Sequence, residues 1–214
     1  LAKWMKGRKT INSDTANRKG RKVYLFCDEF TNYNDSTIGI AAVKLMERLG
    51  YEVIIPDHME SGRAWLSKGL LREAQKIANR NISLLSPVIS ADTPLIGIEP
   101  SAILTFRDEY IDLARDDQFE AAKVLSKNVF TIDEFIAAEI AKGSISKSLF
   151  TKEKKHIKLH GHCQQKAISS VAPTVSILSF PENYSVSTIP SGCCGMAGSF
   201  GYEKEHYDLS MKIG

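Results

Sequence analysis

The chain has 214 residues, which is long enough for one or two domains with a sizeable core. Its composition, 43% hydrophobic and 25% charged, is ordinary for a soluble globular protein, and no apolar run reaches the ~18 residues that span a bilayer. The net charge of +3 arises in residues 1–22, which hold eight basic residues and one acid. We therefore expect a basic linker over residues 1–21 and, because no recognition module is present, no nucleic-acid partner.

Strand and helix patterns alternate from residue 22 onward. Short apolar runs, typical of buried parallel strands, fall at 23–27, 52–55, 95–98, 155–160 and 184–189. Apolar residues spaced three and four apart predict helices at 36–49, 63–80, 101–114, 117–127, 131–142, 162–171 and about 199–212. Residues 173–178 fit either a helix or a strand. The alternation predicts an α/β fold with largely parallel sheets flanked by helices.

A faint internal repeat runs through the chain. Residues 51–56 resemble residues 184–190, and each run follows a strand that ends in or near a cysteine, Cys27 or Cys163. Two half-domains that share one plan explain this similarity. Chance likeness between two α/β units is the alternative explanation.

Three cysteines follow predicted strands in the second half. Cys163 comes after the strand at 155–160, and the adjacent Cys193 and Cys194 come after the strand at 184–189. Because the carboxyl ends of parallel strands share one edge, the three sulfurs are expected to converge there. Soft thiolates favour zinc or an iron–sulfur centre, which usually takes four ligands. His160, His162 or a cysteine beyond residue 214 could complete the set.

These motifs carry a family resemblance. Residues 160–167 and 192–198 resemble the cysteine-rich CCG domain, which occurs in heterodisulfide reductase and in the iron–sulfur subunits of glycolate oxidase. Together with residues 27–33 and 97–101, they look most like the C-terminal part of FAD-linked D-lactate or 2-hydroxy-acid dehydrogenase fusions. The likeness covers residues 22–214. It implies two tandem Rossmann-like half-domains, a degenerate one at 22–150 and a second at 151–214.

The resemblance also implies a cofactor and partners. An iron–sulfur cluster of 4Fe–4S type, or zinc in some relatives, would be held by Cys163, Cys193 and Cys194. Gly192, Gly195 and Gly198 would let it approach the backbone. An upstream FAD-binding domain or subunit would supply the electrons, and a protein or a quinone would accept them. The chain would then be the electron-relaying segment of an oxidoreductase.

The first half departs from the family pattern. Cys27 is its one cysteine, and Met59 and Glu60 stand where the adjacent pair is expected. We predict that this half binds no cluster, although Cys27 could still serve as a ligand. The rim would instead be lined by His58, Glu60, Arg63 and Glu99. These residues could form a pocket for an anionic substrate, a docking surface for the flavin domain, or ordinary solvated loops.

The cysteine usage points to a reducing compartment, so we expect a cytoplasmic protein, either free or peripheral to the inner face of the membrane. We also expect the 214-residue chain by itself to bind a cluster poorly and to be inactive alone. Two alternatives stay open. One is a structural zinc site or metal-free docking module of an oxidoreductase complex, and the other is thiol–disulfide chemistry at Cys193 and Cys194.

Overall fold

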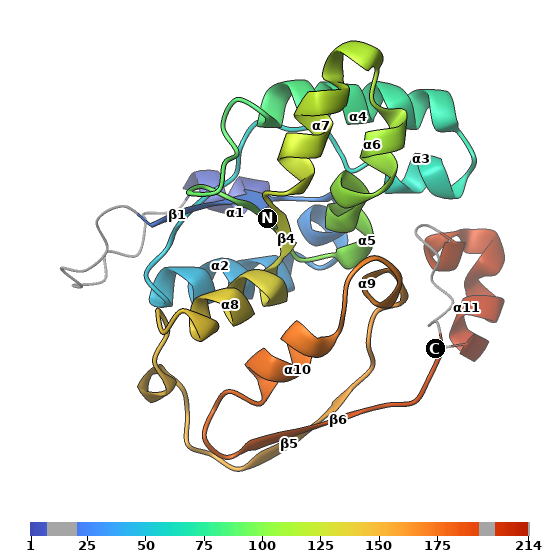
Figure 1. Cartoon of the computed structure of the whole chain (residues 1–214). Helices are drawn as coiled ribbons and strands as arrows, with labels where there is room; N and C mark the ends of the chain where they lie inside the picture. The colour runs from blue at the N-terminus through green and yellow to red at the C-terminus, as the bar shows by residue number, and fades with distance from the viewer. Residues whose placement is uncertain (8–20, 193–199, 214) are drawn as a thin grey trace. The chain divides into compact units, whose positions relative to one another are not determined.

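The structure is a computed structural model that describes residues 1–7, 21–192 and 200–213 (Figure 1). The chain forms two compact units, Leu1–Leu66 with Leu70–Thr131 and Ser67–Gly69 with Ile132–Gly214. Every described strand pair in both units is parallel, and helices connect the strands. The predicted α/β fold with parallel sheets flanked by helices is therefore confirmed.

The first unit is built on four strands in the order β2-β1-β3-β4. They are β1 (Lys22–Phe26), β2 (Glu52–Ile54), β3 (Leu95–Gly97) and β4 (Val129–Thr131). The helices of this part of the chain are α1 (Ala2–Gly7), α2 (Ser36–Arg48), α3 (Arg63–Ser67), α4 (Leu71–Leu85), α5 (Pro100–Ile103), α6 (Glu109–Leu113) and α7 (Phe119–Ser126).

The strand order explains which helices cover which face of this sheet. The connection from β1 to β2 runs one way across the sheet, and the connections to β3 and β4 run the other way. Since such crossovers are right-handed, reversing their direction moves the connecting helices to the opposite face. Accordingly, α2 lies on one face and α4, α6 and α7 lie on the other (Figure 1). The direction reverses between β1 and β3, where open α/β sheets bind ligands beyond the carboxyl ends of the strands.

The core of the first unit is dense. The ring of Phe106 packs edge-on against Phe26, with 5.0 Å between centroids, and contacts the ring of Tyr110 at 4.3 Å. All three side chains are almost fully buried. At the end of β3, a Cβ on Gly97 would lie 2.4 Å from Cβ of Ile103, so only glycine lets α5 pack this closely on the strand.

The second unit has a two-stranded sheet, β5 (Lys155–Leu159) beside β6 (Tyr184–Thr188). Its helices are α8 (Ile132–Ala141), α9 (Cys163–Ile168), α10 (Ala172–Leu178) and α11 (Tyr207–Ile213). Ile157 and Val186 are half-buried, whereas their neighbours His156 and Ser185 are exposed. The sheet thus has one packed face and one face in water, as its alternating sequence requires.

The structure differs from the sequence predictions in several elements. The strand β4 was not predicted, because three residues carry too little pattern to be recognised. The helix expected over 63–80 is broken between α3 and α4 at Gly69, which has a φ of 71°. The helix expected over 101–114 is divided by a 3-10 turn, Leu104–Arg107, between α5 and α6. Residues 173–178 are helical, within α10.

Two further differences concern domain organisation. Residues 2–7, expected to be part of a linker, form α1, and the backbone N–H of Ala2 donates to the Asn32 side chain at 2.9 Å. Helix α8 groups with the second compact unit, whereas the sequence analysis assigned it to the half-domain 22–150. The predicted boundary at residue 150 divides the chain according to its sequence repeat, and it stays a prediction. The two compact units divide the chain according to packing.

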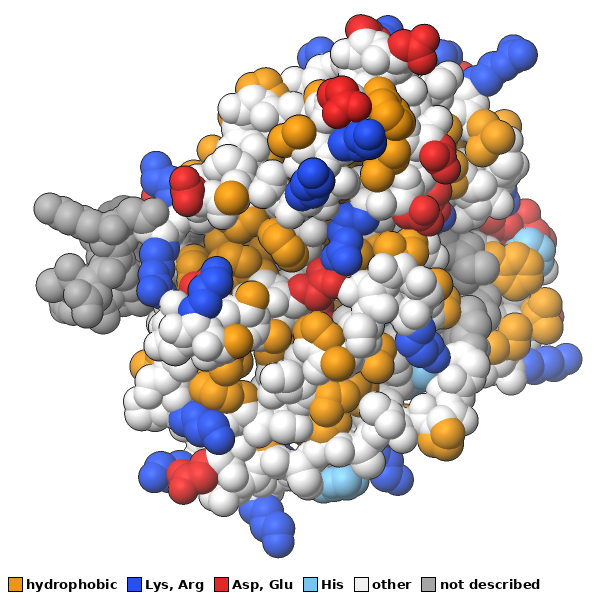
Figure 2. Space-filling model, in the orientation of Figure 1, with side chains coloured by type: hydrophobic (Ala, Val, Ile, Leu, Met, Phe, Trp, Pro, Cys, Tyr) orange, Lys and Arg blue, Asp and Glu red, His pale blue; other side chains and the backbone are white. Residues whose placement is uncertain are grey.

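The surface carries scattered charges of both signs, with apolar side chains gathered over α11 (Figure 2). These exposed apolar residues are Tyr207, Leu209, Met211 and Ile213. Among the described residues, no helix has the length and apolar character needed to cross a bilayer.

Candidate functional site

Three carboxylates follow β1 and β3, at the point where strand connections reverse direction. Each accepts a hydrogen bond from a hydroxyl and another from the backbone N–H of the same residue. The donors are Thr31 for Asp28, Ser61 for Glu29 and Ser101 for Glu99. These bonds keep the carboxylates in place and occupy part of their accepting capacity.

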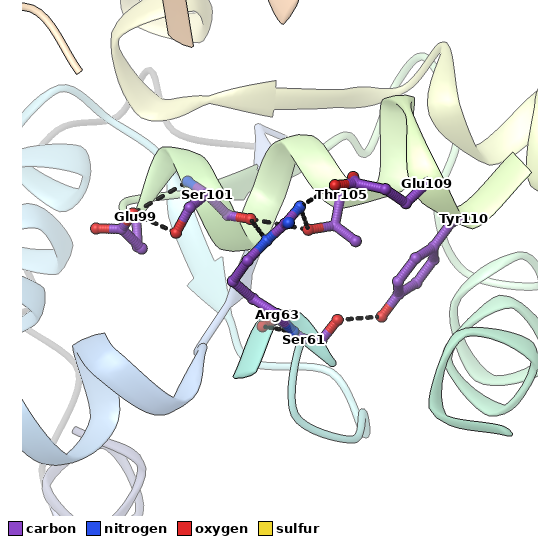
Figure 3. A network of polar contacts seen from close by, with 7 residues as sticks. All are labelled: Ser61, Arg63, Glu99, Ser101, Thr105, Glu109 and Tyr110. Atoms are coloured by element: carbon purple, nitrogen blue, oxygen red, sulfur yellow. Dashed lines mark hydrogen bonds and ion pairs between the residues drawn. The ribbon is translucent and has the colours of Figure 1, made fainter. Parts of the chain in front are cut away.

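Arg63 lies at the centre of a second polar network in the first unit (Figure 3). Its Nε donates to the carbonyl of Ser101 at 2.9 Å, and its Nη2 donates to the hydroxyl of Thr105 at 3.1 Å. The same Nη2 forms a salt bridge with Glu109. Only 12% of the Arg63 side chain is exposed, so its charge is neutralised inside the protein rather than presented to solvent.

The loop that carries Ser61 is held in place by a buried amide and a buried phenol. Tyr110 donates its hydroxyl to the carbonyl of Ser61 at 2.9 Å, and Asn81 donates to the Tyr110 oxygen at 2.8 Å. Asn81 also accepts from the N–H of Met59 and donates to the carbonyl of Glu60. Burial raises the pKa of Tyr110, so it acts here as a neutral donor.

His58 joins the ends of β1 and β2. Its Nε2 accepts from the backbone N–H of Cys27 at 3.3 Å, and its Nδ1 donates to the carbonyl of Met59 at 2.6 Å. These partners require a proton on Nδ1 and none on Nε2, which is one neutral tautomer. Burial lowers the pKa of His58, in agreement with a neutral ring. Both nitrogens are therefore occupied, and His58 serves as a structural bridge.

Cys27 and His58 border a cavity of about 510 Å³ beneath α1. Most of its wall is apolar, supplied by Met5, Val53 and Ile54. Burial raises the pKa of the Cys27 thiol to about 11, so the metal-free thiol stays protonated at neutral pH and is a weak nucleophile. Glu60, which was predicted on the rim of the first half together with His58, Arg63 and Glu99, accepts a hydrogen bond from the indole of Trp65 at 2.6 Å.

The burial of the carboxyl group of Asp28 was not predicted from the sequence. Asp28 is fully buried, and burial raises its pKa to about 6, with smaller contributions from the charges of Glu29 and Glu99. Its position directly after the first strand was the signal that could have revealed it. Glu109 was also missed, because it is 46 residues from Arg63 in sequence and only tertiary contact joins the two.

In the second unit, the predicted histidines and cysteine lie around the end of β5. His162 is the N-cap of α9, and its Nδ1 accepts from the N–H of Gln164 at 3.2 Å. Cys163 is the first residue of α9 and is partly buried. His160 contacts the carbonyl of Gly192 through Nε2 at 3.0 Å, which connects the end of β5 to the segment that follows β6.

The described residues hold part of the predicted ligand set. Cys193, Cys194, Gly195 and Gly198 lie outside them, so their arrangement stays a prediction. Within the described ranges, no three His, Cys, Asp or Glu side chains are grouped as metal ligands would be. Among the described residues, a Cβ placed on Gly192 would meet nothing within 4 Å.

Several known proteins are similar in sequence to this chain over most of its length. It is 27% identical to D-2-hydroxyglutarate dehydrogenase of Escherichia coli (strain K12) over 204 residues, which are 95% of this chain and 19% of that protein. It is 24% identical over 196 residues to a subunit of the anaerobic glycerol-3-phosphate dehydrogenase of the same organism, covering 90% of this chain and 48% of that protein.

A third relative is lactate utilization protein A of Bacillus subtilis (strain 168), 25% identical over 184 residues, which are 84% of this chain and 74% of that protein. No protein-family model matches the chain. The chain spans about a fifth of the length of the D-2-hydroxyglutarate dehydrogenases to which it is similar. The similarities thus connect the chain to parts of dehydrogenases and to oxidoreductase-related proteins.

Proposed function

We propose that this chain is the iron–sulfur segment of an FAD-linked 2-hydroxy-acid dehydrogenase and relays electrons from the flavin to an external acceptor. The observation that carries this proposal is the similarity, over 84–95% of the chain, to proteins named for the oxidation or use of D-2-hydroxyglutarate, glycerol 3-phosphate and lactate. Two of these three compounds are 2-hydroxy acids. The resemblance of the cysteine motifs to the CCG domain supports the same function.

The ligand set that we propose consists of Cys163 together with Cys193 and Cys194. Thiolates are the ligands that iron–sulfur clusters require, and Cys163 follows a parallel strand at the edge where such folds bind ligands. When bound, a cluster would supply one-electron transfer. The protein contributes the thiolates and the hydrogen bonds that set the reduction potential.

For the first unit, we infer a docking role in place of a substrate or metal site. An anionic substrate needs an uncompensated cation, but the charge of Arg63 is balanced by Glu109. Both ring nitrogens of His58 bond to backbone groups, which disfavours metal binding by this ring. The edge keeps Glu60 and the carboxylates of Glu29 and Glu99, which suit a basic surface on the flavin domain or subunit.

The proposal is tested by metal analysis of the natural polypeptide that contains this chain, purified without oxygen. We expect iron and acid-labile sulfide in equal amounts and visible absorption that bleaches on reduction with the 2-hydroxy acid. Cys163→Ser should remove most of the iron. Cys27→Ser is the matched control, since it removes the one described thiol of the other unit, and it should leave the iron content unchanged. Absence of iron from the wild-type polypeptide would contradict the proposal.

A structural zinc site or a metal-free docking module is the second candidate. It rests on the chemistry of the proposed ligands, because thiolates bind zinc as well as iron–sulfur centres. Under this alternative, the natural polypeptide would contain zinc alone or no metal, and Cys163→Ser would lower thermal stability without altering electron transfer. The same metal analysis therefore separates the two functions.

A further inference from the structure

A cavity of about 360 Å³ lies in the first unit between α4 and the segment that connects α6 to α7 (Figure 1). This volume is within the range of small-molecule sites. The cavity shares no residue with the polar networks at the strand ends. Its lining residues are all polar and include no acid: Gln75, Lys76, Asn79, Arg80, Ser83 and Arg115.

The lining residues of α4 lie on one side of the helix. Positions 75, 79 and 83 form one row at spacings of four, and positions 76 and 80 form the adjacent row. Lys76 and Arg80 are therefore neighbours, one turn apart. Arg115 faces them from the second element. Three cations from two elements thus border the same cavity.

Asn79 holds the backbone of Arg115 against this side of α4. Its side chain is almost fully buried, and its Oδ1 accepts from the N–H of Arg115 at 2.9 Å. Its Nδ2 donates to the carbonyl of Leu113 at 2.9 Å and to the carbonyl of Gln75 at 2.7 Å. These bonds fix the position of the third cation relative to the two on α4.

The charges around the cavity leave it positive. Lys76 pairs with Glu73 at 2.8 Å, and Arg115 pairs with Asp117 at 3.5 Å. Both pairs are exposed and therefore weak, so a multivalent anion can displace the two acids. The guanidinium of Arg80 has no ion-pair partner within the described part of the chain. The cavity thus offers the uncompensated cation that the strand ends lack.

The lining also indicates the kind of anion. Among the described residues, none that lines the cavity is aromatic or aliphatic, so a ring or an acyl chain would have nothing to pack against. Guanidinium groups bind phosphate through paired hydrogen bonds, and a lysine adds a point charge. Cations that approach from two elements suit a tetrahedral anion, which has oxygens on several sides, better than a planar carboxylate.

We propose that this cavity is a binding site for a compact, multivalent phosphate, held by Lys76, Arg80 and Arg115. Asn79 is a positioning residue, because it acts through the backbone of Arg115. We assign binding to this site and no reaction. The inference goes beyond the proposed function and does not rest on it, since the site lies in the first unit and requires neither a cluster nor a flavin.

The first test is calorimetric titration of the natural polypeptide that contains this chain with inorganic pyrophosphate. Arg80→Gln and Arg115→Gln should each weaken binding about tenfold, the effect of losing a hydrogen bond to a charged group. Arg72→Gln is the matched control, because it removes the same charge from the same helix but lies outside the lining. Its effect should be about twofold or less in about 0.1 M salt, since Arg72 is about 12 Å from Arg80 along the helix and the Debye length is ~10 Å.

The second test locates the bound anion on the protein. Lysines are acetylated with and without pyrophosphate, and the modified positions are mapped by mass spectrometry. Saturating pyrophosphate should largely abolish the acetylation of Lys76, and this protection should be lost in Arg80→Gln. Lys123 is the matched control, since it is an exposed lysine that likewise pairs with a glutamate three residues earlier, Glu120, and does not line the cavity. Its acetylation should not change.

Three results would overturn the proposal. Lys76 would stay unprotected by pyrophosphate if the acidic surface of a protein, and not a small anion, occupies the cavity. Equal weakening by Arg72→Gln and Arg80→Gln would mean that diffuse charge on α4 attracts the anion. Citrate, a polycarboxylate, should bind about tenfold more weakly than pyrophosphate, and equal binding would contradict the assignment to phosphate.

Discussion

The two units end their parallel strands in different ways. In the first unit, the strand ends carry buried or half-buried carboxylates, and each is paired with a serine or threonine. Arg63 is enclosed among Ser101, Thr105 and Glu109. In the second unit, the strand ends carry Cys163 and two histidines, and the bonds that join them run largely to backbone atoms.

This difference follows from burial. A charge removed from water must be paired inside the protein, so the charged side chains of the first unit bond to hydroxyls, to backbone groups and, for Arg63, to a carboxylate. The second unit is more exposed at its sheet, and its thiol Cys163 is partly buried. The carboxylates at the edge of the first unit fit the docking role that we propose, and the partly exposed thiol of Cys163 fits the metal centre that we propose for the second unit.

The largest expected effect on stability comes from a change in the core of the first unit. Phe106→Ala removes a ring packed between Phe26 and Tyr110 and should lower the free energy of unfolding by about 3–5 kcal/mol. Ile157→Ala, in the half-exposed sheet of the second unit, should cost only about 1–2 kcal/mol. Urea unfolding followed by tryptophan fluorescence measures the first, because Trp4 and Trp65 both lie in the first unit. Equal losses of unfolding free energy in the two variants would contradict the expectation that the core of the first unit is the more buried one.

The second-largest expected effect on stability comes from removing the buried guanidinium of Arg63. Arg63→Met leaves the carboxylate of Glu109 without its partner, and the Oε2 atom of that carboxylate is already buried without a hydrogen bond among described residues. We expect a loss of about 2–3 kcal/mol, which a second change, Glu109→Gln, should partly restore. Lys166→Met is the comparison in the second unit and should cost about 0.5 kcal/mol or less, since its bond is exposed. Differential scanning calorimetry of the wild type and these variants distinguishes the outcomes.

The smallest expected effect is a dependence of stability on pH, which arises from Asp28 in the first unit. The pKa of Asp28 is about 6 in the folded protein, above the ~3.9 of an unfolded chain, so the native state holds this proton more tightly. The stability that this protonation contributes is complete below about pH 4 and is lost as the pH rises through 6. Relative to Asp28→Asn, the wild type should lose on the order of 2 kcal/mol between about pH 4.5 and about pH 7.5.

Urea midpoints for the wild type and Asp28→Asn at both pH values measure this difference, because groups shared by the two proteins cancel. A difference that is independent of pH between these two values would mean that the fold does not raise the pKa of Asp28 above that of an unfolded chain.

Local pattern determined much of this protein. Five of the six strands in the described part of the chain were evident as short apolar runs, because burial in a parallel sheet demands them. The carboxyl ends of these strands then indicated where Cys27, His58, Glu99, His160 and Cys163 would lie, because parallel strands share that edge. The breaks near Gly69 and Leu104 were not predicted, since helical periodicity continues across both.

Tertiary structure alone decided what those side chains do. Arg63 is a free cation in the sequence and a neutralised one in the fold, because Glu109 and Thr105 reach it from over forty residues away. From the sequence, His58 is a candidate rim residue and His160 a candidate metal ligand. In the fold, both ring nitrogens of His58 and Nε2 of His160 bond to backbone groups. The sequence determines which groups arrive at the edge of a sheet. Which of them remain available for chemistry depends on hydrogen-bond partners and burial, which are properties of the folded chain.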